Sequence, residues 1–311
     1  MRIILLLNIL FISISVYAQN GRYLDREIQI EADNDAFTGD IYADQYYSQG
    51  SYGRYRVVDT TGFMKKIMSI SLNHRIFTPR NVWQTNVEDF DRPYAGQLSV
   101  TGGLSYYDKR SAREVGIELG VMGKASLAEP IQVGWHKTFG MGKPEGWAYQ
   151  INNSPIINGY FKYAHLLVRA GNVQILSESN AALGTAFVYG RQDVVIRLGK
   201  FKDLDQSIQY GGNLGGNLGG KKKKSKYTHE TIIFGALGPE YVLYNSTIEG
   251  NIIGKPSVHT EERVPFVWQG RAGAMFAWSS FDLAVIYYFR SVETVGATRH
   301  KYVGIRLSQR F

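Results

Sequence analysis

The sequence has no cysteine among its 311 residues, so its fold uses no disulfide bond, and cysteine content leaves the cellular compartment open. It also has no long apolar run after its N-terminus. No later segment approaches the roughly 18 consecutive apolar residues that a transmembrane helix needs. A helical membrane protein is therefore excluded. A membrane β-barrel is not, because its strands are only half apolar and each gives a weak hydropathy signal.

The N-terminus carries the features of a secretory signal peptide. Arg2 precedes an apolar run over residues 3–17, and Val16-Tyr17-Ala18 has the form of a small-residue cleavage site. The run is too short, and wrongly flanked, for a membrane helix. We expect residues 1–18 to be a signal peptide and residues 19–311 to form a single domain.

The positive charge of the chain is concentrated in one loop. Residues 221–224 and 226 are lysines, and removing these five from the net charge of +8 leaves +3. The basic character is therefore largely local, and a secreted protein meets little nucleic acid. We expect no nucleic-acid partner. The adjoining GGNLGG repeat predicts a low-complexity segment over residues 211–226 that buries no core.

Most of the chain alternates apolar and polar residues with the period of a β-strand. Ile28 and Ile30 alternate with Gln29 and Glu31, and about twelve such segments have lengths near the 9 to 11 residues of a tilted membrane strand. The final residue, Phe311, resembles the C-terminal assembly signal of bacterial outer-membrane barrels. The alternative is a soluble β-sandwich. The pattern favours an all-β, antiparallel transmembrane barrel of about twelve strands in the bacterial outer membrane.

Only residues 123–150 break this pattern. Ile131, Trp135 and Phe139 recur at the spacing of one helical face, and Gln132 and His136 lie four residues apart, so a helix points both the same way. We expect Glu129 to cap this helix, Pro130 to take its first position, and Gly140 to end it.

Placing both termini on the periplasmic side puts the helical segment at the outer end. The segments 34–46, 75–94, 122–155, 247–264 and 291–299 then become outer loops, whereas the short hairpin turns and the Gly/Lys segment fall inside. Asn34, Asp35, Ser48 and His136 all come to the outer end of the barrel.

These residues suggest hydrolytic chemistry. The carboxylate of Asp35, the amide of Asn34 and the hydroxyl of Ser48 are oxygen ligands that suit Ca²⁺. His136 could act as general base toward water, while a cation stabilises the oxyanion formed from an ester. The alternative interpretation of Asn34-Asp35 is an ordinary polar turn after a strand.

Three blocks of sequence resemble the outer-membrane lipid A 3'-O-deacylase family. They are EADNDAFTGDIYADQYYSQG at 31–50, DRPYAG at 91–96, and GVMGKASLAEPIQVGWHK at 120–137 followed by GW-x-x-Q at 146–150. The resemblance implies a twelve-stranded barrel whose active site lies between the wall and a helix from an outer loop. It also implies Ca²⁺-dependent hydrolysis of the 3'-linked acyl ester of lipid A, the lipopolysaccharide anchor in the outer leaflet.

The family's functional residues carry over onto positions of this chain. The Asn-Asp pair falls on Asn34 and Asp35, and the histidine that activates water falls on His136. Ser48 stands where the family has threonine, which keeps the hydroxyl, so the Ca²⁺ ligands implied are Asp35, Ser48 and Asn34. The family also has a basic residue in the second outer loop, for which Arg80 and Arg92 are candidates that we do not assign.

Several residues near His136 are candidates for substrate contact. Gln132 could orient the substrate or pack against the wall, while Trp135, Phe139 and Trp147 could contact acyl chains. An interfacial aromatic belt predicts the same aromatic residues.

Two rival functions use the same barrel. A serine esterase resembling the outer-membrane phospholipases would use Ser48 as nucleophile, His136 as base and Asn34 to orient the base. A passive porin or structural barrel would need no site at all, although about eight to twelve strands leave little lumen once side chains fill it. Acyl-chain preference, phosphate requirement and oligomeric state are left open.

Overall fold

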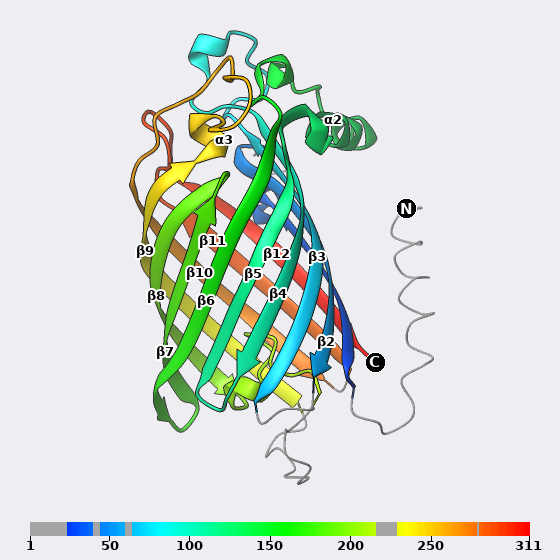
Figure 1. Cartoon of the computed structure of the whole chain (residues 1–311), viewed down its shortest axis with the longest axis vertical. Helices are drawn as coiled ribbons and strands as arrows, with labels where there is room; N and C mark the ends of the chain where they lie inside the picture. The colour runs from blue at the N-terminus through cyan, green and yellow to red at the C-terminus, as the bar shows by residue number, and fades with distance from the viewer. Residues whose placement is uncertain (1–23, 40–43, 60–63, 216–228, 279) are drawn as a thin grey trace.

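The computed structural model describes residues 24–39, 44–59, 64–215, 229–278 and 280–311, and these form one closed antiparallel barrel (Figure 1). Each strand pairs with its neighbours in the chain, and β1 closes the barrel against β12. The predicted fold is confirmed, while the expected signal peptide lies outside the described residues. The strands are β1 (Arg26–Asn34), β2 (Tyr46–Asp59), β3 (Lys65–Thr78), β4 (Ala95–Tyr107), β5 (Ser111–Met122), β6 (Ser154–Ala170), β7 (Val173–Gly184), β8 (Phe187–Lys200), β9 (His229–Asn245), β10 (Phe266–Trp278), β11 (Phe281–Arg290) and β12 (His300–Arg310).

The period-two pattern of each strand separates an apolar outer face from a polar interior. In β1, Ile28 and Ile30 are exposed, whereas Glu27 and Gln29 are buried inside. This distribution inverts that of a soluble protein, because lipid is the solvent of the outer face. Among the described residues, none of the helices combines the length and apolarity needed to cross a membrane.

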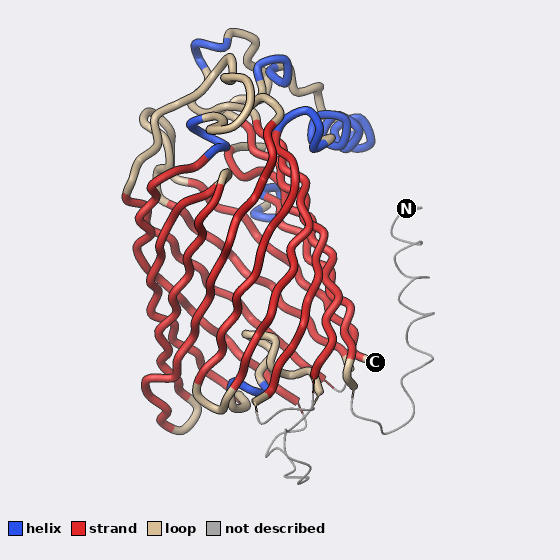
Figure 2. The backbone as a smooth tube through the Cα atoms, viewed as in Figure 1, coloured by secondary structure: helices blue, strands red, loops and turns tan. Residues whose placement is uncertain are grey.

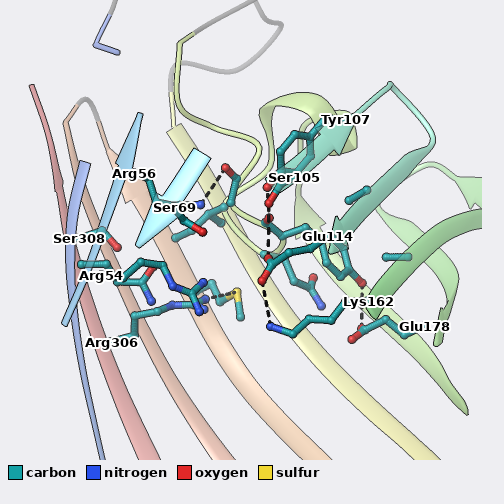
Figure 3. Close-up of a pocket in the computed structure, with 18 of the residues that line it drawn as sticks. Arg54, Arg56, Ser69, Ser105, Tyr107, Glu114, Lys162, Glu178, Arg306 and Ser308 are labelled. Atoms are coloured by element: carbon teal, nitrogen blue, oxygen red, sulfur yellow. Dashed lines mark hydrogen bonds and ion pairs between the residues drawn. The ribbon is translucent and has the colours of Figure 1, made fainter. Parts of the chain in front are cut away.

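The interior is held together by ion pairs between strands. Arg310 of β12 bonds Asp282 of β11 at 2.9 Å, and Arg56 of β2 bonds Glu27 of β1, with both pairs largely out of contact with solvent. Buried charges are tolerated only when paired in this way. Figure 3 shows one interior cavity, of about 230 Å³, in which Glu114 pairs with Lys162.

The two ends of the barrel differ. One carries long loops, the helix α2 (Ala128–Phe139), the single turn α3 (Ser246–Glu249) and the 3₁₀ turns η1 (Asp35–Thr38), η2 (Val87–Asp89), η3 (Gly123–Ser126) and η4 (Gly146–Tyr149) (Figures 1 and 2). The other carries short hairpin turns and the chain's C-terminus. Long outer loops and short periplasmic turns are the asymmetry of bacterial barrels, so the α2 end faces outward.

The loop between β8 and β9 corrects one expectation. Residues 211–215, the described part of the segment predicted to bury no core, lie in the periplasmic end of the lumen together with residues 201–210, which include the 3₁₀ turn η5 (Leu204–Gln206). Leu204 and Leu214 are fully buried there. This segment can be buried because its apolar side chains are interspersed with glycines and polar residues, and its backbone forms hydrogen bonds inside the lumen. Lys65 Nζ, for example, donates to the Gly212 carbonyl at 2.6 Å. We call residues 201–215 the plug. Residues 216–228, with the lysine run, lie outside the described residues.

Candidate active site

A cavity of about 390 Å³ lies between α2 and the tops of β1 and β2. It opens on the outer surface of the wall rather than into the lumen, because Asn34 and Gln49 are paired residues on the same outward face as the exposed Ile28 and Ile30. All six predicted site residues line it. The lining residues are Asn34, Asp35, Ala36, Phe37, Asp44, Ser48, Gln49, Gln132, Trp135, His136, Phe139, Gly140 and Met141.

The end of β1 forms one corner of the cavity. Asn34 is the N-cap of η1, and its side-chain oxygen accepts a hydrogen bond from the Ala36 amide at 2.8 Å. Asp35 follows it, buried, with Oδ2 accepting from the Gln45 amide at 2.7 Å. Burial, and then the nearby charge of Asp44, raise the pKa of Asp35 to about 9, against the smaller effect of the backbone hydrogen bonds.

Ser48 owes its position to a β-bulge. The pairing of β2 with β3 shifts register between Tyr47 and Gln49, so Ser48 is the extra residue without a partner in the ladder. Its hydroxyl donates to the Ile76 carbonyl over 3.4 Å, a long bond. A bulge re-aims a side chain that would otherwise follow the strand's alternation, and here it directs a hydroxyl to the outer cavity.

The helix α2 supplies the opposite wall. It begins at Ala128, two residues before the expected Pro130, and Leu127 precedes it in the left-handed conformation with φ 62°, so Glu129 is not the cap. It ends at Gly140 as predicted. Gln132 and His136 share its buried face, whereas Trp135 and Phe139 are 44% and 61% exposed, with ring centroids 4.6 Å apart.

Asp44 is the site residue that sequence reasoning missed. Its Oδ2 accepts from His136 Nε2 at 2.7 Å and from Gln132 Nε2 at 2.7 Å. A histidine that acts as base is commonly held by a carboxylate, which was the available signal. The same block, however, contains Asp33, Asp35 and Asp40, and spacing alone does not select among the four aspartates.

Both nitrogens of His136 are engaged. Nδ1 bonds the Gly142 carbonyl at 2.6 Å, and because a carbonyl only accepts, Nδ1 carries a proton. Burial lowers the pKa of His136, but the hydrogen bonds to Asp44 and Gly142 outweigh burial and leave it above its ordinary value. His136 therefore holds a proton more readily than a free histidine does.

Three other candidates lie away from the cavity. Trp147 is buried and donates its indole N–H to Gln132 Oε1 at 2.7 Å, so it supports the helix and is not an acyl-chain contact. Arg92 is buried inside the rim, where it bonds Thr247 at 2.8 Å. Arg80 is exposed and does not line the cavity.

The donor set near Asp35 has the chemistry of a calcium site. The cavity is lined by the carboxylate of Asp35, the amide of Asn34 and the hydroxyl of Ser48, whose hydrogen bond to Ile76 is long. A cation would offset both the burial of Asp35 and the nearby charge of Asp44, which together raise the pKa of Asp35. Within the described ranges no group of three His, Cys, Asp or Glu residues is arranged to hold a metal ion, so such a site depends on neutral oxygens as well.

Comparisons with known proteins agree with the barrel fold. The family model described as outer membrane protein LpxR matches residues 4–311. The solved structure of LpxR from Salmonella typhimurium is similar in fold, with a TM-score of 0.72 and 17% identity over 92% of this chain and 100% of that chain.

Two autotransporter barrels are more distant. The β domain of the Bordetella autotransporter Brka has a TM-score of 0.46 and 9% sequence identity, and the match covers 92% of this chain and 98% of that chain. The translocator domain of NalP from Neisseria meningitidis has a TM-score of 0.43 and 8% sequence identity, and the match covers 100% of this chain and 97% of that chain. These values carry no argument about the site. None of the curated protein sequences matches the chain.

Proposed function

The chain belongs to the LpxR family of outer membrane proteins, and on this premise we propose that it hydrolyses the ester that links an acyl chain to the 3' position of lipid A. The observation that carries the proposal is the position of the cavity. It lies on the outer surface of the wall at the outward end, where lipid A of the outer leaflet reaches it. Its polar groups are those that ester hydrolysis requires.

His136 is the general base. Because Nδ1–H is held by the Gly142 carbonyl, the proton taken from water goes to Nε2. In the resting structure Asp44 occupies Nε2, so it shifts aside as water enters. Gln132 keeps Asp44 beside the ring, where its charge stabilises the imidazolium that forms.

Hydrolysis then proceeds in two steps. Water adds to the ester carbonyl to give a tetrahedral oxyanion, and the imidazolium of His136 returns its proton to the sugar oxygen as the acyl bond breaks. The products are a fatty acid and a free 3'-hydroxyl. Bound by Asp35, Ser48 and Asn34, Ca²⁺ would supply polarisation of the ester carbonyl and stabilisation of the oxyanion.

The apolar part of the cavity suits the acyl chain. Phe37, Trp135, Phe139 and Met141 line it, whereas the proposed base and oxygen ligands line the remainder. An amphipathic substrate whose ester separates a polar sugar from a hydrocarbon chain matches this division.

The deciding experiment is mass spectrometry of lipid A incubated with purified, folded protein in detergent with Ca²⁺. We expect loss of one 3'-linked acyl group, arrest by a chelator, and a loss of about 10²-fold or more in kcat for His136→Ala, since general bases contribute on that order. Intact lipid A after incubation with wild-type protein and Ca²⁺ would contradict the proposal.

The serine esterase is the second candidate, because Ser48 and His136 share the cavity. The geometry disfavours it: the Ser48 hydroxyl points to the Ile76 carbonyl, and His136 bonds Asp44 and Gly142. We expect Ser48→Ala to keep measurable activity with a raised Ca²⁺ requirement. Complete loss of activity, together with Ser48-dependent labelling by a fluorophosphonate, would favour the serine mechanism.

A further inference from the structure

The run DRPYAG, residues 91–96, is one of the three blocks that carry the family resemblance, yet none of its residues lines the site cavity. It leads from the second outer loop into β4 at the outward rim. Its first residue, Asp91, contacts Tyr46 at the start of β2, on the strand side of the cavity. Its last residue, Gly96, contacts Ser126 and Ala128 at the start of α2.

At the first end, Asp91 holds a residue of unusual conformation. Tyr46 has φ 57°, a left-handed value that few bulky residues adopt. Its ring is buried, its hydroxyl donates to Asp91 Oδ2 at 2.7 Å, and the same hydroxyl accepts from the Thr298 amide at 2.8 Å. Such a conformation persists only when surrounding contacts enforce it.

Tyr46 stands between the polar groups of the site. Two residues before it is Asp44, which bonds His136, and the intervening Gln45 amide bonds Asp35. Two residues after it is Ser48, on the bulge. The left-handed turn at Tyr46 therefore sets how these groups face the cavity, and the bond to Asp91 anchors that turn.

At the C-terminal end of the run, Gly96 and Tyr94 pack against α2 and the residues that support it. A Cβ on Gly96 would lie 2.1 Å from Ser126 Oγ and 2.3 Å from Ala128 Cβ, so only glycine lets the start of α2 lie this close to β4. The Tyr94 ring packs 5.0 Å from the ring of Trp147, whose indole bonds Gln132 on the same helical face as His136.

We propose that Asp91 is a positioning residue of this site. By holding Tyr46, it keeps Asp44 and Ser48 at a fixed separation from α2. The same DRPYAG run packs against the start of α2 and so fixes the position of the helix. The inference rests on the proposed function for its kinetic consequence only. It assigns to Asp91 and Tyr46 no contact with substrate or with the reacting atoms.

The kinetic test compares Tyr46→Phe, Asp91→Asn and the double variant with wild type, and uses Tyr55→Phe, on the outer face of the same strand, as the matched control. We expect each single variant to lower kcat about tenfold with KM within about twofold, since misplacement of reacting groups affects kcat. The double variant should be no worse than Tyr46→Phe, because both single variants disrupt the Tyr46–Asp91 hydrogen bond and Tyr46→Phe also removes the bond from the Thr298 amide. Wild-type kcat in Tyr46→Phe, or additive losses, would overturn the inference.

A second measurement does not depend on activity. Hydrogen–deuterium exchange of the folded barrels should be faster in Tyr46→Phe over residues 44–49 and 128–139, with the other strands unchanged, and unaltered in Tyr55→Phe. Unchanged exchange over both segments counts against the inference. If wild-type protein releases no acyl chain, the proposed function fails, and the exchange result alone decides the role of Asp91.

Discussion

The His136–Asp44 pair is the residue-scale feature on which the proposed chemistry depends. Its two partners act in opposite ways: the Gly142 carbonyl fixes which nitrogen carries the resting proton, and Asp44 stabilises the charged ring. Because the carboxylate that aligns the ring also raises its pKa, a smaller fraction of His136 is neutral, and able to accept a proton, at low pH.

The first prediction concerns pH. His136 must be neutral to accept a proton, and Asp44 raises its pKa, so activity should rise with pH through a midpoint above the ordinary histidine value near 6.5. Asp44→Asn removes the carboxylate charge, which lowers that pKa. We expect the acid limb of the kcat profile to move to lower pH, although the maximal rate falls because alignment is weakened.

The measurement is the rate of acyl release between about pH 5 and 9 at saturating Ca²⁺. Glu249→Gln, which alters an outer-end carboxylate paired with Arg263 and away from the cavity, serves as control. An acid limb that stays in place in Asp44→Asn would show that Asp44 does not set the protonation of the base.

At the scale of elements, α2 has two stripes with different surroundings. Gln132 and His136 face the wall, whereas the stripe containing Ile131, Trp135 and Phe139 is exposed. Because the helix lies outside the barrel beside an apolar wall, this stripe meets hydrocarbon chains rather than protein. It should contribute to substrate affinity more than to turnover.

The second prediction follows from that stripe. Replacing Trp135 and Phe139 together by serine removes apolar surface worth on the order of 1–2 kcal/mol, so KM should rise about tenfold while kcat changes little. Trp278→Ser, an exposed tryptophan at the opposite end of the barrel, is the matched control. A fall in kcat at unchanged KM would show instead that the stripe serves to hold the helix in place.

The strands and the helix α2 were predictable from the sequence, whereas two local backbone features, at Ser48 and Leu127, were not. The alternation of Ile28 and Ile30 with polar residues predicted a barrel strand, and the four-residue spacing of Gln132 and His136 predicted one helical face. The bulge at Ser48 was not predictable, since it depends on how two strands pair, and neither strand encodes the register alone. Leu127 was missed for a similar reason: its left-handed conformation is enforced by the seating of α2, against its own preference.

At the scale of the whole molecule, the described residues of the plug narrow the lumen of the barrel. The plug fills its periplasmic end, and Glu230 anchors the plug by accepting from the Ile208 amide at 2.7 Å and the Lys202 amide at 2.9 Å. Interior cavities of about 230 and 500 Å³ lie above the plug. The passive porin is therefore disfavoured on structural grounds.

The third prediction tests that closure. Wild-type protein in a planar bilayer should show no steady ionic conductance, and Glu230→Ala, which removes the acceptor for both amides, should introduce brief openings. Glu249→Ala, at the outer end, should behave as wild type. A stable open level in the wild-type protein would show that the plug does not seal the lumen.

The plug also bears on why sequence reasoning erred there. The GGNLGG repeat has the composition of a flexible linker, yet Leu214 within it is completely buried. Its neighbours are Val58, Ile67 and Tyr107, residues of β2, β3 and β4 that are far away in the chain. Burial of that kind is a property of the closed barrel, and no local pattern encodes it.

Because the cavity opens toward the membrane, its position determines how the substrate reaches it. If lipid A is the substrate, as proposed, it already lies in the plane of the membrane, so it would reach Trp135 and His136 by lateral diffusion without entering water. The relevant concentration is then the number of substrate molecules per area of leaflet, and not the amount per volume. Diluting lipid A with an inert amphiphile in mixed micelles, at constant bulk concentration, should slow the reaction as its surface fraction falls.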